Sequence, residues 1–467
     1  MKLQEIKTMK NAETQNIEVR NPFDNVLVGV VPETSASEII NVVNSAQAAA
    51  SDFRFSTPHE RRTLLNKIAS LLNAEAEPIA QILSAEMGKT ITEARGEVRR
   101  AQNTLRLSGD AATFLDGEVL HCGIVEGGVD RQAAVTYVPT GVVGAITPFN
   151  YPVNLMCHKL GPAIAAGNAI VVKPSPKAPL AAQMFIDLCQ QAGAPEGLIQ
   201  MVHGGADAAI ALAQSPIDLL SFTGGPGAGL ALKRASGLIR TLMELGGNDP
   251  LFVMHDGDLD AAAATAVGHR YEIAGQSCAA VKKLYVHSSV EAEFTERLLE
   301  KVAKVTTGDP ADPATVMGPI IDRAAAIEID SRIQAAITAG ATLLTGGLRE
   351  HTHFDPVVMR DVDPSTKLMQ DETFGPVLAM RRFTSLADTI DEVNAAGFGL
   401  QAGIYTNDHG AIRDLTKRLQ VGGIMINEGP DFRAEHVPFG GVRKSGLGRE
   451  GVRIAAREMS ETKVVID

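Results

Sequence analysis

Short apolar runs alternate with longer segments of helical periodicity through most of this chain. From Gly141 onward, helical patterns of roughly 10–20 residues separate four apolar runs. These runs cover 142–147, 169–173, 199–202 and 219–222. A second series starts near Leu251 and includes the runs 283–287, 341–345, 378–383, 402–405 and 423–426. The alternation of strand and helix predicts parallel sheets with crossover helices, and therefore an α/β fold.

The part of the chain before these runs has a different pattern. Residues 1–20 are polar, and we expect a loose arm or an edge strand there. Thr57 and Glu60 have the spacing of a capping box, so a helix should begin at this point. Gly88 should close that helical segment. A second, heavily charged helical pattern then extends to about Phe114.

Two β-rich runs between 117 and 138 flank Gly127 and Gly128, which predicts a hairpin. The stretch 458–466 has the pattern of a final strand, and it could pair with the hairpin of another subunit. A hairpin that joins subunits and a simple surface flap both agree with the sequence alone.

The composition is that of a globular protein with a substantial core. Of 467 residues, 45% are hydrophobic and 21% are charged. The net charge of −12 argues against a nucleic-acid or acidic membrane surface as partner, because phosphate binding needs a basic face. No apolar stretch is long enough to span a bilayer. The four cysteines have no zinc-site spacing, and with no secretory signal they indicate a reducing cytoplasm.

Two segments carry candidate chemistry. Cys278 follows Gly275 and Gln276 and has small neighbours, which helps a substrate to approach a thiolate. A lone cysteine is more often a small buried hydrophobe. However, Glu244 lies 34 positions upstream between apolar residues and a glycine pair, where a poorly solvated carboxylate can act as a base near neutral pH.

The motifs around these two residues resemble the signatures of the aldehyde dehydrogenase superfamily. The signatures are Glu244-Leu245-Gly246-Gly247-Asn248 and Gly275-Gln276-Ser277-Cys278. Further landmarks follow the family's order over nearly the whole chain: Pro148-Phe149-Asn150, Lys173-Pro174-Ser175, Phe222-Thr223-Gly224-Gly225, Glu372-Thr373-Phe374-Gly375-Pro376 and Pro438-Phe439-Gly440-Gly441. Any one of these is weak, but the ordered set is specific.

The resemblance implies the aldehyde dehydrogenase fold, with two Rossmann-like parallel-sheet domains and a small β flap for oligomerisation. It implies a dinucleotide-binding domain formed by 1–116 and 139–245 and a catalytic domain at 246–432. The hairpin 117–138 and the C-terminal segment 450–467 would then join subunits into a homodimer or homotetramer.

The resemblance also implies a site for NAD or NADP. The residues expected to bind it are Thr147, Pro148, Lys173, Ser175, Lys177, Phe222, Thr223, Gly224, Gly225, Leu245, Glu372 and Phe374. The glycine-rich run at 224–229 opens a helix after a strand, which suits a pyrophosphate, although such a run also serves as a plain tight turn. Members that prefer NAD often carry Glu three positions after the lysine that corresponds to Lys173. Here Pro176 and Lys177 follow instead, so both cofactors stay open.

The reaction implied is oxidation of an aldehyde to a carboxylate. The Cys278 thiolate would attack the carbonyl, and the Asn150 amide with the Cys278 backbone N–H would stabilise the oxyanion. Hydride transfer to the nicotinamide would leave a thioester, which Glu244 would hydrolyse through a water molecule. Family members that transfer the acyl group to coenzyme A generally lack this carboxylate, so Glu244 favours hydrolysis.

Basic residues in three segments suggest an anionic substrate. Arg106, His158 and Arg433 lie in segments that line the family's substrate tunnel, with Ser277 beside the nucleophile. The closest resemblance is to the lactaldehyde, phosphonoacetaldehyde and non-phosphorylating glyceraldehyde-3-phosphate subgroup. Members that act on phosphonate or phosphate aldehydes often carry Arg where this chain has Ser277. Phosphonoacetaldehyde is the leading expectation, and lactaldehyde or glyceraldehyde 3-phosphate is the alternative.

Three other classes fit less well. A coenzyme-A-acylating dehydrogenase is disfavoured by Glu244. A non-catalytic homologue would be expected to have lost Cys278, Glu244 or Asn150. A cysteine hydrolase would leave the glycine-rich nucleotide corner without a purpose.

Overall fold

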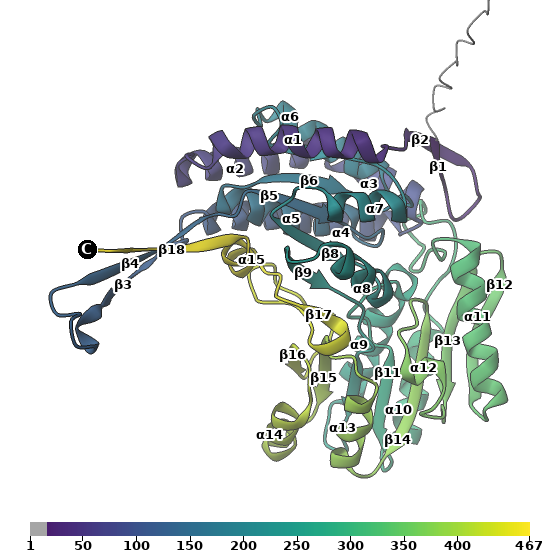
Figure 1. Cartoon of the computed structure of the whole chain (residues 1–467). Helices are drawn as coiled ribbons and strands as arrows, with labels where there is room; N and C mark the ends of the chain where they lie inside the picture. Colours follow the sequence, from purple (N-terminus) through teal and green to yellow (C-terminus); the bar gives the residue numbers. More distant parts are fainter. Residues whose placement is uncertain (1–15) are drawn as a thin grey trace, which may run out of the picture.

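The computed structural model describes residues 16–467, so most of the predicted N-terminal arm lies outside the described residues. Two large sheets organise the chain (Figure 1). The first has six strands in the order β17-β9-β8-β5-β6-β7, and only the short β17 is antiparallel to its neighbour. Its strands are β5 (Val142–Ile146), β6 (Ala169–Lys173), β7 (Ile199–Met201), β8 (Leu219–Thr223), β9 (Arg240–Glu244) and β17 (Gly446–Leu447).

Helices cover the first sheet in layers. Helices α1 and α7 pack against each other and against the sheet, as do α5 and α6. Every residue of α5 is buried, because α2 and α4 cover the side that faces away from the sheet. The helices of this half are α1 (Ala36–Phe53), α2 (Pro58–Ala74), α3 (Ala76–Met87), α4 (Ile91–Ala111), α5 (Pro152–Ala166), α6 (Leu180–Gln191), α7 (Ala206–Gln214) and α8 (Pro226–Ala235).

The expected capping box is confirmed. The Thr57 hydroxyl accepts from the Glu60 N–H, and the Glu60 carboxylate accepts from the Thr57 N–H. Gly88 caps the end of the helical segment as predicted, but the segment is two helices, α2 and α3, which meet at Glu75. The charged pattern beyond it forms α4, which begins with a further capping box at Thr90.

The second sheet has seven strands in the order β12-β13-β14-β11-β10-β15-β16. All neighbours are parallel except β12 and β13. Its strands are β10 (Pro250–Val253), β11 (Lys283–His287), β12 (Thr342–Glu350), β13 (His353–Arg360), β14 (Val377–Phe383), β15 (Gln401–Tyr405) and β16 (Gly423–Ile426). Its helices are α9 (Leu259–Tyr271), α10 (Glu291–Val302), α11 (Arg323–Thr338), α12 (Lys367–Gln370), α13 (Leu386–Ala395) and α14 (His409–Arg418).

The apolar pattern did not predict β13. It contains Asp355 and Pro356, two residue types that are depleted in strands. The parallel ladder to β14 begins only at Val357, after the proline, so the missing N–H of Pro356 costs no bond in that ladder.

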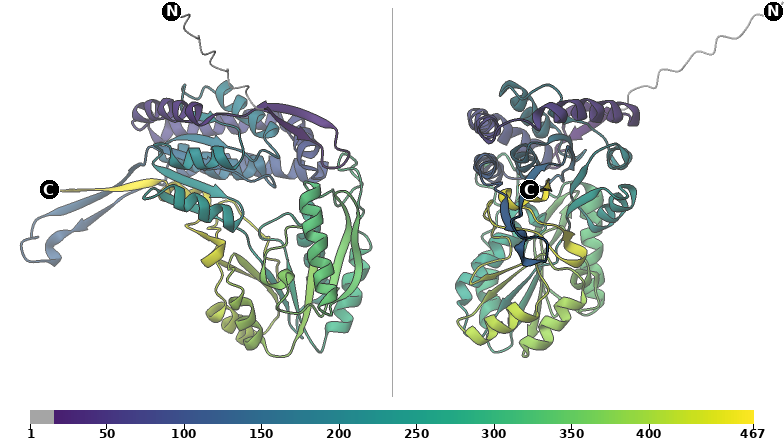
Figure 2. Two further views of the ribbon diagram at one scale, coloured as in Figure 1. Left: turned by 45° about the vertical axis from the view of Figure 1, so that its right-hand side comes forward. Right: turned by 60° about the vertical axis from the view of Figure 1, so that its left-hand side comes forward.

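A narrow three-stranded sheet projects from the body, with β4 (Gln132–Pro139) between β3 (Glu118–His121) and β18 (Ser460–Ile466) (Figure 2). Strand β18 follows the short helix α15 (Val452–Glu458) and is antiparallel to β4 of its own chain. Strand β18 thus pairs with the hairpin of its own chain, and its pairing with the hairpin of another subunit stays a prediction. Ile124, Val125 and Val465 expose more than half of their surface on this flap.

A two-stranded sheet, β1 (Asn16–Arg20) with β2 (Leu27–Pro32), completes the sheets of the described part. Within residues 16–467, no helix combines the length and the apolar character needed to cross a bilayer.

Candidate active site

A cavity of about 540 Å³ lies at the carboxyl ends of β5, β6, β8 and β9. Ligands bind at this edge of parallel sheets because several loops and helix N-termini converge there. Most of the residues that the sequence singled out for chemistry and for the dinucleotide line this one cavity. They are Thr147, Pro148, Asn150, Lys173, Ser175, Phe222, Thr223, Gly224, Gly225, Glu244, Leu245, Cys278, Glu372 and Phe374.

The segment that leads to Cys278 has unusual backbone geometry. Helix α9 ends at Tyr271, and the 3₁₀ turn Glu272–Gly275 follows it. Ile273, Ala274 and Gly275 have φ values of 42°, 53° and 73°, in the left-handed region that only glycine adopts without cost. A carboxylate oxygen of Glu93, on α4, accepts the Ile273 N–H at 2.7 Å and stabilises this turn. Strain of this kind typically persists where surrounding contacts fix it at a functional site.

Gln276 and Asn150 connect the nucleophile segment to the first half of the chain. Gln276 Oε1 accepts the Ile321 N–H at 3.0 Å, and its Nε2 donates to the Ile273 carbonyl at 3.0 Å. The Gln276 carbonyl accepts from Asn150 Nδ2 at 2.9 Å. An amide nitrogen carries two N–H groups, so Asn150 has a second donor for an oxygen in the cavity.

Cys278 is a partly buried free thiol that packs beside Ala279, Leu400 and Phe439. Burial raises the pKa of this thiol, and the positive charge of Lys282 lowers it. The thiolate, which is the nucleophilic form, therefore needs a nearby positive charge.

Glu244 is the last residue of β9, and the surrounding residues bury its carboxyl group. Its Oε2 atom is buried and has no hydrogen-bond partner among residues 16–467. Burial raises the pKa of Glu244 well above its ordinary value, and the nearby Glu450 raises it further. A carboxylate with a raised pKa and an unused oxygen in the cavity has the properties of a general base for water.

The remaining lining residues suit a dinucleotide. Helix α8 begins after Gly225, and within the described chain no side chain caps its first N–H groups. These N–H groups and the helix dipole favour a phosphate. The Thr223 hydroxyl is also buried and lacks a hydrogen-bond partner in the part of the chain that the structure describes. The site therefore fits the group that the sequence motifs imply.

Lys173 and Glu372 both line this cavity. Lys173 Nζ donates to the carbonyls of Pro174 and Gly204 at 2.9 and 2.7 Å, and burial lowers its pKa to about 8. Glu372 accepts the Gly247 N–H at 3.2 Å, and a Cβ atom at Gly246 would overlap its carboxylate. Glycine at position 246 is thus required for Glu372 to occupy this place.

Lys177 is directed elsewhere. Its ammonium forms an ion pair with Asp322, the N-cap of α11, and lies 5.5 Å from the ring centroid of Phe149. It is absent from the residues that line the cavity, so the structure does not bring it to the other dinucleotide residues.

The four residues predicted to bind substrate separate into two groups. Arg106 and Arg433 line a second opening together with Arg100. His158 and Ser277 are buried: His158 is 1% exposed, and the Ser277 hydroxyl donates to Asp431 at 3.0 Å. Only the two arginines therefore face a space that an anion can enter.

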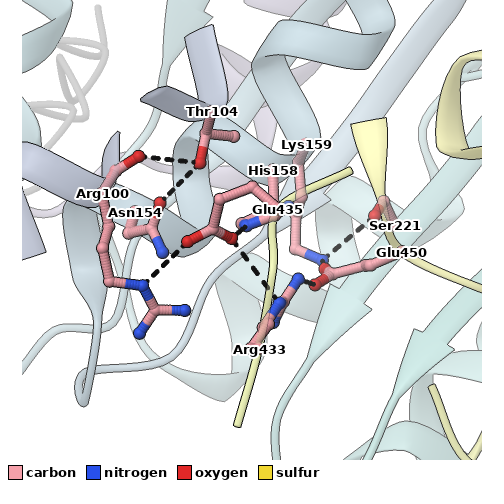
Figure 3. Close-up of polar contacts among 9 residues, drawn as sticks. All are labelled: Arg100, Thr104, Asn154, His158, Lys159, Ser221, Arg433, Glu435 and Glu450. Atoms are coloured by element: carbon pink, nitrogen blue, oxygen red, sulfur yellow. Dashed lines mark hydrogen bonds and ion pairs between the residues drawn. The ribbon is translucent and has the colours of Figure 1, made fainter. Parts of the chain in front are cut away.

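Two glutamates neutralise much of this positive charge (Figure 3). Glu435 accepts from Arg100 Nε at 2.8 Å and lies 2.6 Å from His158 Nε2. Burial lowers the pKa of His158 and Arg433 lowers it further, whereas the hydrogen bond to Glu435 raises it. Arg433 donates to Glu450 at 2.9 Å, and Glu450 also accepts from Lys159 at 3.0 Å. Among the described residues, Arg106 forms no ion pair and keeps its charge available.

The sequence reasoning overlooked Arg100, Glu435, Glu450, Asp431 and Lys282 as parts of the site. Arg100 and Arg106 line the same opening from α4, but a separation of six positions places two side chains about 120° apart around a helix, so this spacing alone does not predict it. Nothing in the local sequence distinguishes the two glutamates from solvated surface carboxylates. No cluster of three or more His, Cys, Asp or Glu side chains suited to a metal ion occurs in the described residues.

Comparison with known proteins identifies the family of this chain. The family model described as "Aldehyde dehydrogenase family" matches residues 8–465. The chain is 39% identical over 447 residues to the sulfoacetaldehyde dehydrogenase of Neptuniibacter caesariensis, covering 96% of this chain and 98% of that protein. It is 38% identical over 451 residues to aspartate-semialdehyde dehydrogenase 1 of Pseudomonas canavaninivorans, covering 96% of each. The NADP-dependent glyceraldehyde-3-phosphate dehydrogenase of Bacillus halodurans C-125, solved with NADP, matches with a TM-score of 0.94 at 35% identity, covering 97% of this chain and 95% of that one.

Proposed function

The chain belongs to the aldehyde dehydrogenase family and has its α/β fold, and we propose that it oxidises a small anionic aldehyde to its carboxylate. In this proposal Cys278 is the nucleophile, Asn150 stabilises the oxyanion and Glu244 is the base. The family accounts for the NAD(P)-dependent aldehyde dehydrogenase activity. One observation carries the residue assignment: the three side chains line the same cavity as the dinucleotide residues.

In this mechanism the Cys278 sulfur attacks the aldehyde carbon and forms a thiohemiacetal. The free N–H of the Asn150 amide and the Cys278 backbone N–H stabilise the oxyanion. A preorganised donor of this type typically contributes about 3–4 kcal/mol. The hydrogen bond from Asn150 to the Gln276 carbonyl holds the amide in place, so little reorganisation is needed when charge develops.

NAD or NADP, when bound, would accept the hydride that leaves the former aldehyde carbon as the thiohemiacetal becomes a thioester, and we assign Glu372 and Phe374 to its nicotinamide end. The thioester on Cys278 is then hydrolysed. Glu244 takes a proton from water, the hydroxide adds to the acyl carbon, and the Cys278 thiolate leaves. The raised pKa of Glu244 suits it to accept this proton near neutral pH. Coenzyme A transfer is disfavoured, because a competent water base competes with it.

The proposed substrate class depends on the second opening. Arg100, Arg106 and Arg433 line it; Glu435 pairs with Arg100 and Glu450 with Arg433, so among the described residues the charge of Arg106 is the one left without an ion pair. Two of the relatives are named for sulfoacetaldehyde, which carries a sulfonate, and aspartate semialdehyde, which carries a carboxylate beside its ammonium group. Guanidinium groups bind sulfonate, phosphonate and carboxylate through paired hydrogen bonds. Phosphonoacetaldehyde belongs to the proposed class, and lactaldehyde, which is neutral, is the alternative.

A panel of aldehydes tests this proposal. We expect kcat/KM to be highest for phosphonoacetaldehyde or sulfoacetaldehyde and lower for lactaldehyde and a neutral aldehyde of equal size, with either cofactor. Arg106→Met should reduce kcat/KM for the anionic compounds about tenfold and leave the neutral one unchanged. Arg99→Met is the matched control, because Arg99 is exposed on the same helix and does not line the opening. Equal rates for neutral and anionic aldehydes would rule out the anionic class.

We also propose that the protein is a homodimer or homotetramer assembled through the flap. Its exposed apolar side chains favour contact with another copy, because monomers rarely expose large contiguous groups of apolar side chains. Light scattering of the wild type should give a mass of two or four chains. A variant with Ile124→Ser and Val465→Ser should shift toward the 49.3 kDa monomer.

A further inference from the structure

Lys282 places a buried ammonium group against the loop that carries Cys278. Its side chain is 2% exposed, and the residue directly precedes β11. The Nζ atom donates to the Ser277 carbonyl at 2.8 Å and to the Cys278 carbonyl at 2.6 Å. Its backbone N–H donates to the Asp249 carbonyl at 3.0 Å. Lys282 thereby connects the nucleophile loop to the start of β10.

The position of Lys282 also affects the pKa of Cys278, because other charged groups near this thiol are acidic. After burial, which has the largest effect, Asp431, Glu372 and Asp249 all raise the pKa of Cys278. Lys282 is the cation that opposes them. A thiolate surrounded by three carboxyl groups is unfavourable, and a nearby ammonium offsets part of that cost.

Lys282 also contacts the other side of the cavity. Its Nζ lies 3.6 Å from Glu372 Oε1, and Glu372 is the carboxylate proposed to hold the nicotinamide end of the cofactor. The lysine charge is therefore shared between the nucleophile loop and Glu372. Removing Glu372 should leave more of this charge for the thiol.

We propose that Lys282 is a positioning residue that fixes the nucleophile loop through two carbonyl oxygens and supplies the buried positive charge against which the Cys278 thiolate forms. This inference rests on the proposed role of Cys278. It adds a residue that touches neither substrate nor reacting atoms and acts through the loop and its charge.

The experiment measures how fast iodoacetamide alkylates Cys278 as a function of pH, quantified on the Cys278 peptide by mass spectrometry in the folded full-length protein. Lys282→Met should lower the rate at pH 7.5 about tenfold and move the inflection to higher pH. Lys282→Arg should recover part of the rate, because it keeps the charge. Glu372→Gln should raise the rate above that of the wild type.

Lys283→Met is the matched control. Lys283 is equally buried and donates to a carbonyl, that of Met369 at 3.3 Å, but it does not contact the nucleophile loop. Its variant should alkylate within about twofold of the wild type. If Lys282→Met does not fold, the comparison of Lys282→Arg and Glu372→Gln with the wild type decides the matter. An unchanged inflection in folded Lys282→Met, or no response in the latter two variants, would overturn the inference.

The failure of the proposed function would look different. Cys278→Ser should abolish aldehyde oxidation, and retention of activity would remove Cys278 as nucleophile. The alkylation profile of the Lys282 variants would still report whether the lysine controls the thiol.

Discussion

His158 Nε2 lies 2.6 Å from the Glu435 carboxylate, while the buried Nδ1 atom of this histidine has no hydrogen-bond partner among residues 16–467. Glu435 also accepts from Arg100 Nε at 2.8 Å. Burial opposes its ionisation, but the hydrogen bond from His158 and the adjacent charges lower the pKa of Glu435 to about 2. The carboxylate is therefore ionised at every working pH and limits how much positive charge the opening presents.

Removing the negative charge of Glu435 should increase the preference of the enzyme for anionic aldehydes. In Glu435→Gln, Arg100 and Arg433 lose a competing anion, so kcat/KM for an anionic aldehyde relative to a neutral one should rise about fivefold, equivalent to about 1 kcal/mol. Steady-state kinetics on both compounds checks this. Asp391→Asn, which removes an exposed carboxylate that pairs with Arg418, controls for the change in net charge. A ratio that stays constant or falls would show that Glu435 does not screen the substrate.

Replacing Glu244 should separate the two halves of the reaction. Glu244→Gln should still release one equivalent of reduced cofactor per site in a burst, while steady turnover falls about 10²- to 10⁴-fold for loss of a general base. Rapid-mixing absorbance at 340 nm records both phases. Unchanged steady turnover would remove Glu244 as the base.

The same group should determine the pH dependence of turnover. The base must be ionised, and burial and Glu450 raise the pKa of Glu244. The wild-type kcat should therefore fall as pH drops through values above the ordinary carboxyl range. The acidic limb should vanish in the slow Glu244→Gln enzyme, whereas Glu461→Gln, on exposed β18, should retain it.

Much of the architecture could be predicted from the sequence because strands and caps are local signals. The runs 169–173, 283–287 and 423–426 coincide with β6, β11 and β16, and the box at Thr57 is present. The α/β fold is confirmed. The three catalytic candidates came from ordered motifs, since the local patterns alone also fit turns and core residues.

The polar surroundings of the site could not be predicted in this way. Glu435, Glu450 and Lys282 resemble surface charges in sequence, and their burial arises from segments far apart in the chain. Glu450, for example, meets Lys159 from a helix almost 300 positions earlier. The ion pair of Lys177 likewise could not be predicted, because it depends on the position of Asp322 at the start of α11.

Stability should decrease from acidic to neutral pH because of Glu86. This carboxyl group accepts the Leu180 and Ala181 N–H groups at 2.7 and 3.0 Å, yet burial raises its pKa to about 8, with a smaller rise from Glu97. Lys89 lowers it slightly. Between about pH 4.5 and 8 the folded state keeps a proton that the unfolded state has lost, so the free energy of unfolding should fall by roughly 2–4 kcal/mol over this range.

Urea denaturation at pH 5, 6, 7 and 8 checks this expectation. Glu86→Gln cannot ionise, so its free energy of unfolding should depend less on pH than that of the wild type. Exposed Glu75 provides a control as Glu75→Gln, which should follow the wild-type slope. Equal slopes for the wild type and Glu86→Gln would contradict the assignment.

The ion pair between Lys177 and Asp322 should govern how well the enzyme uses NADP. With Pro176 in place of a carboxylate, the sequence offers no acidic repulsion to a 2′-phosphate, but Asp322 holds the lysine that could attract one. Asp322→Asn should free Lys177 and raise kcat/KM for NADP relative to NAD about threefold to tenfold, the range of one new charged hydrogen bond. Lys177→Met alone should change the ratio less than twofold, because its charge is already neutralised. The double variant should return to the wild-type ratio, since no lysine remains to be released.

Initial rates with both cofactors at a saturating aldehyde concentration test all three proteins. If Asp322→Asn kept its raised NADP preference after Lys177 was also replaced, the effect would have to arise from α11 itself and not from this lysine.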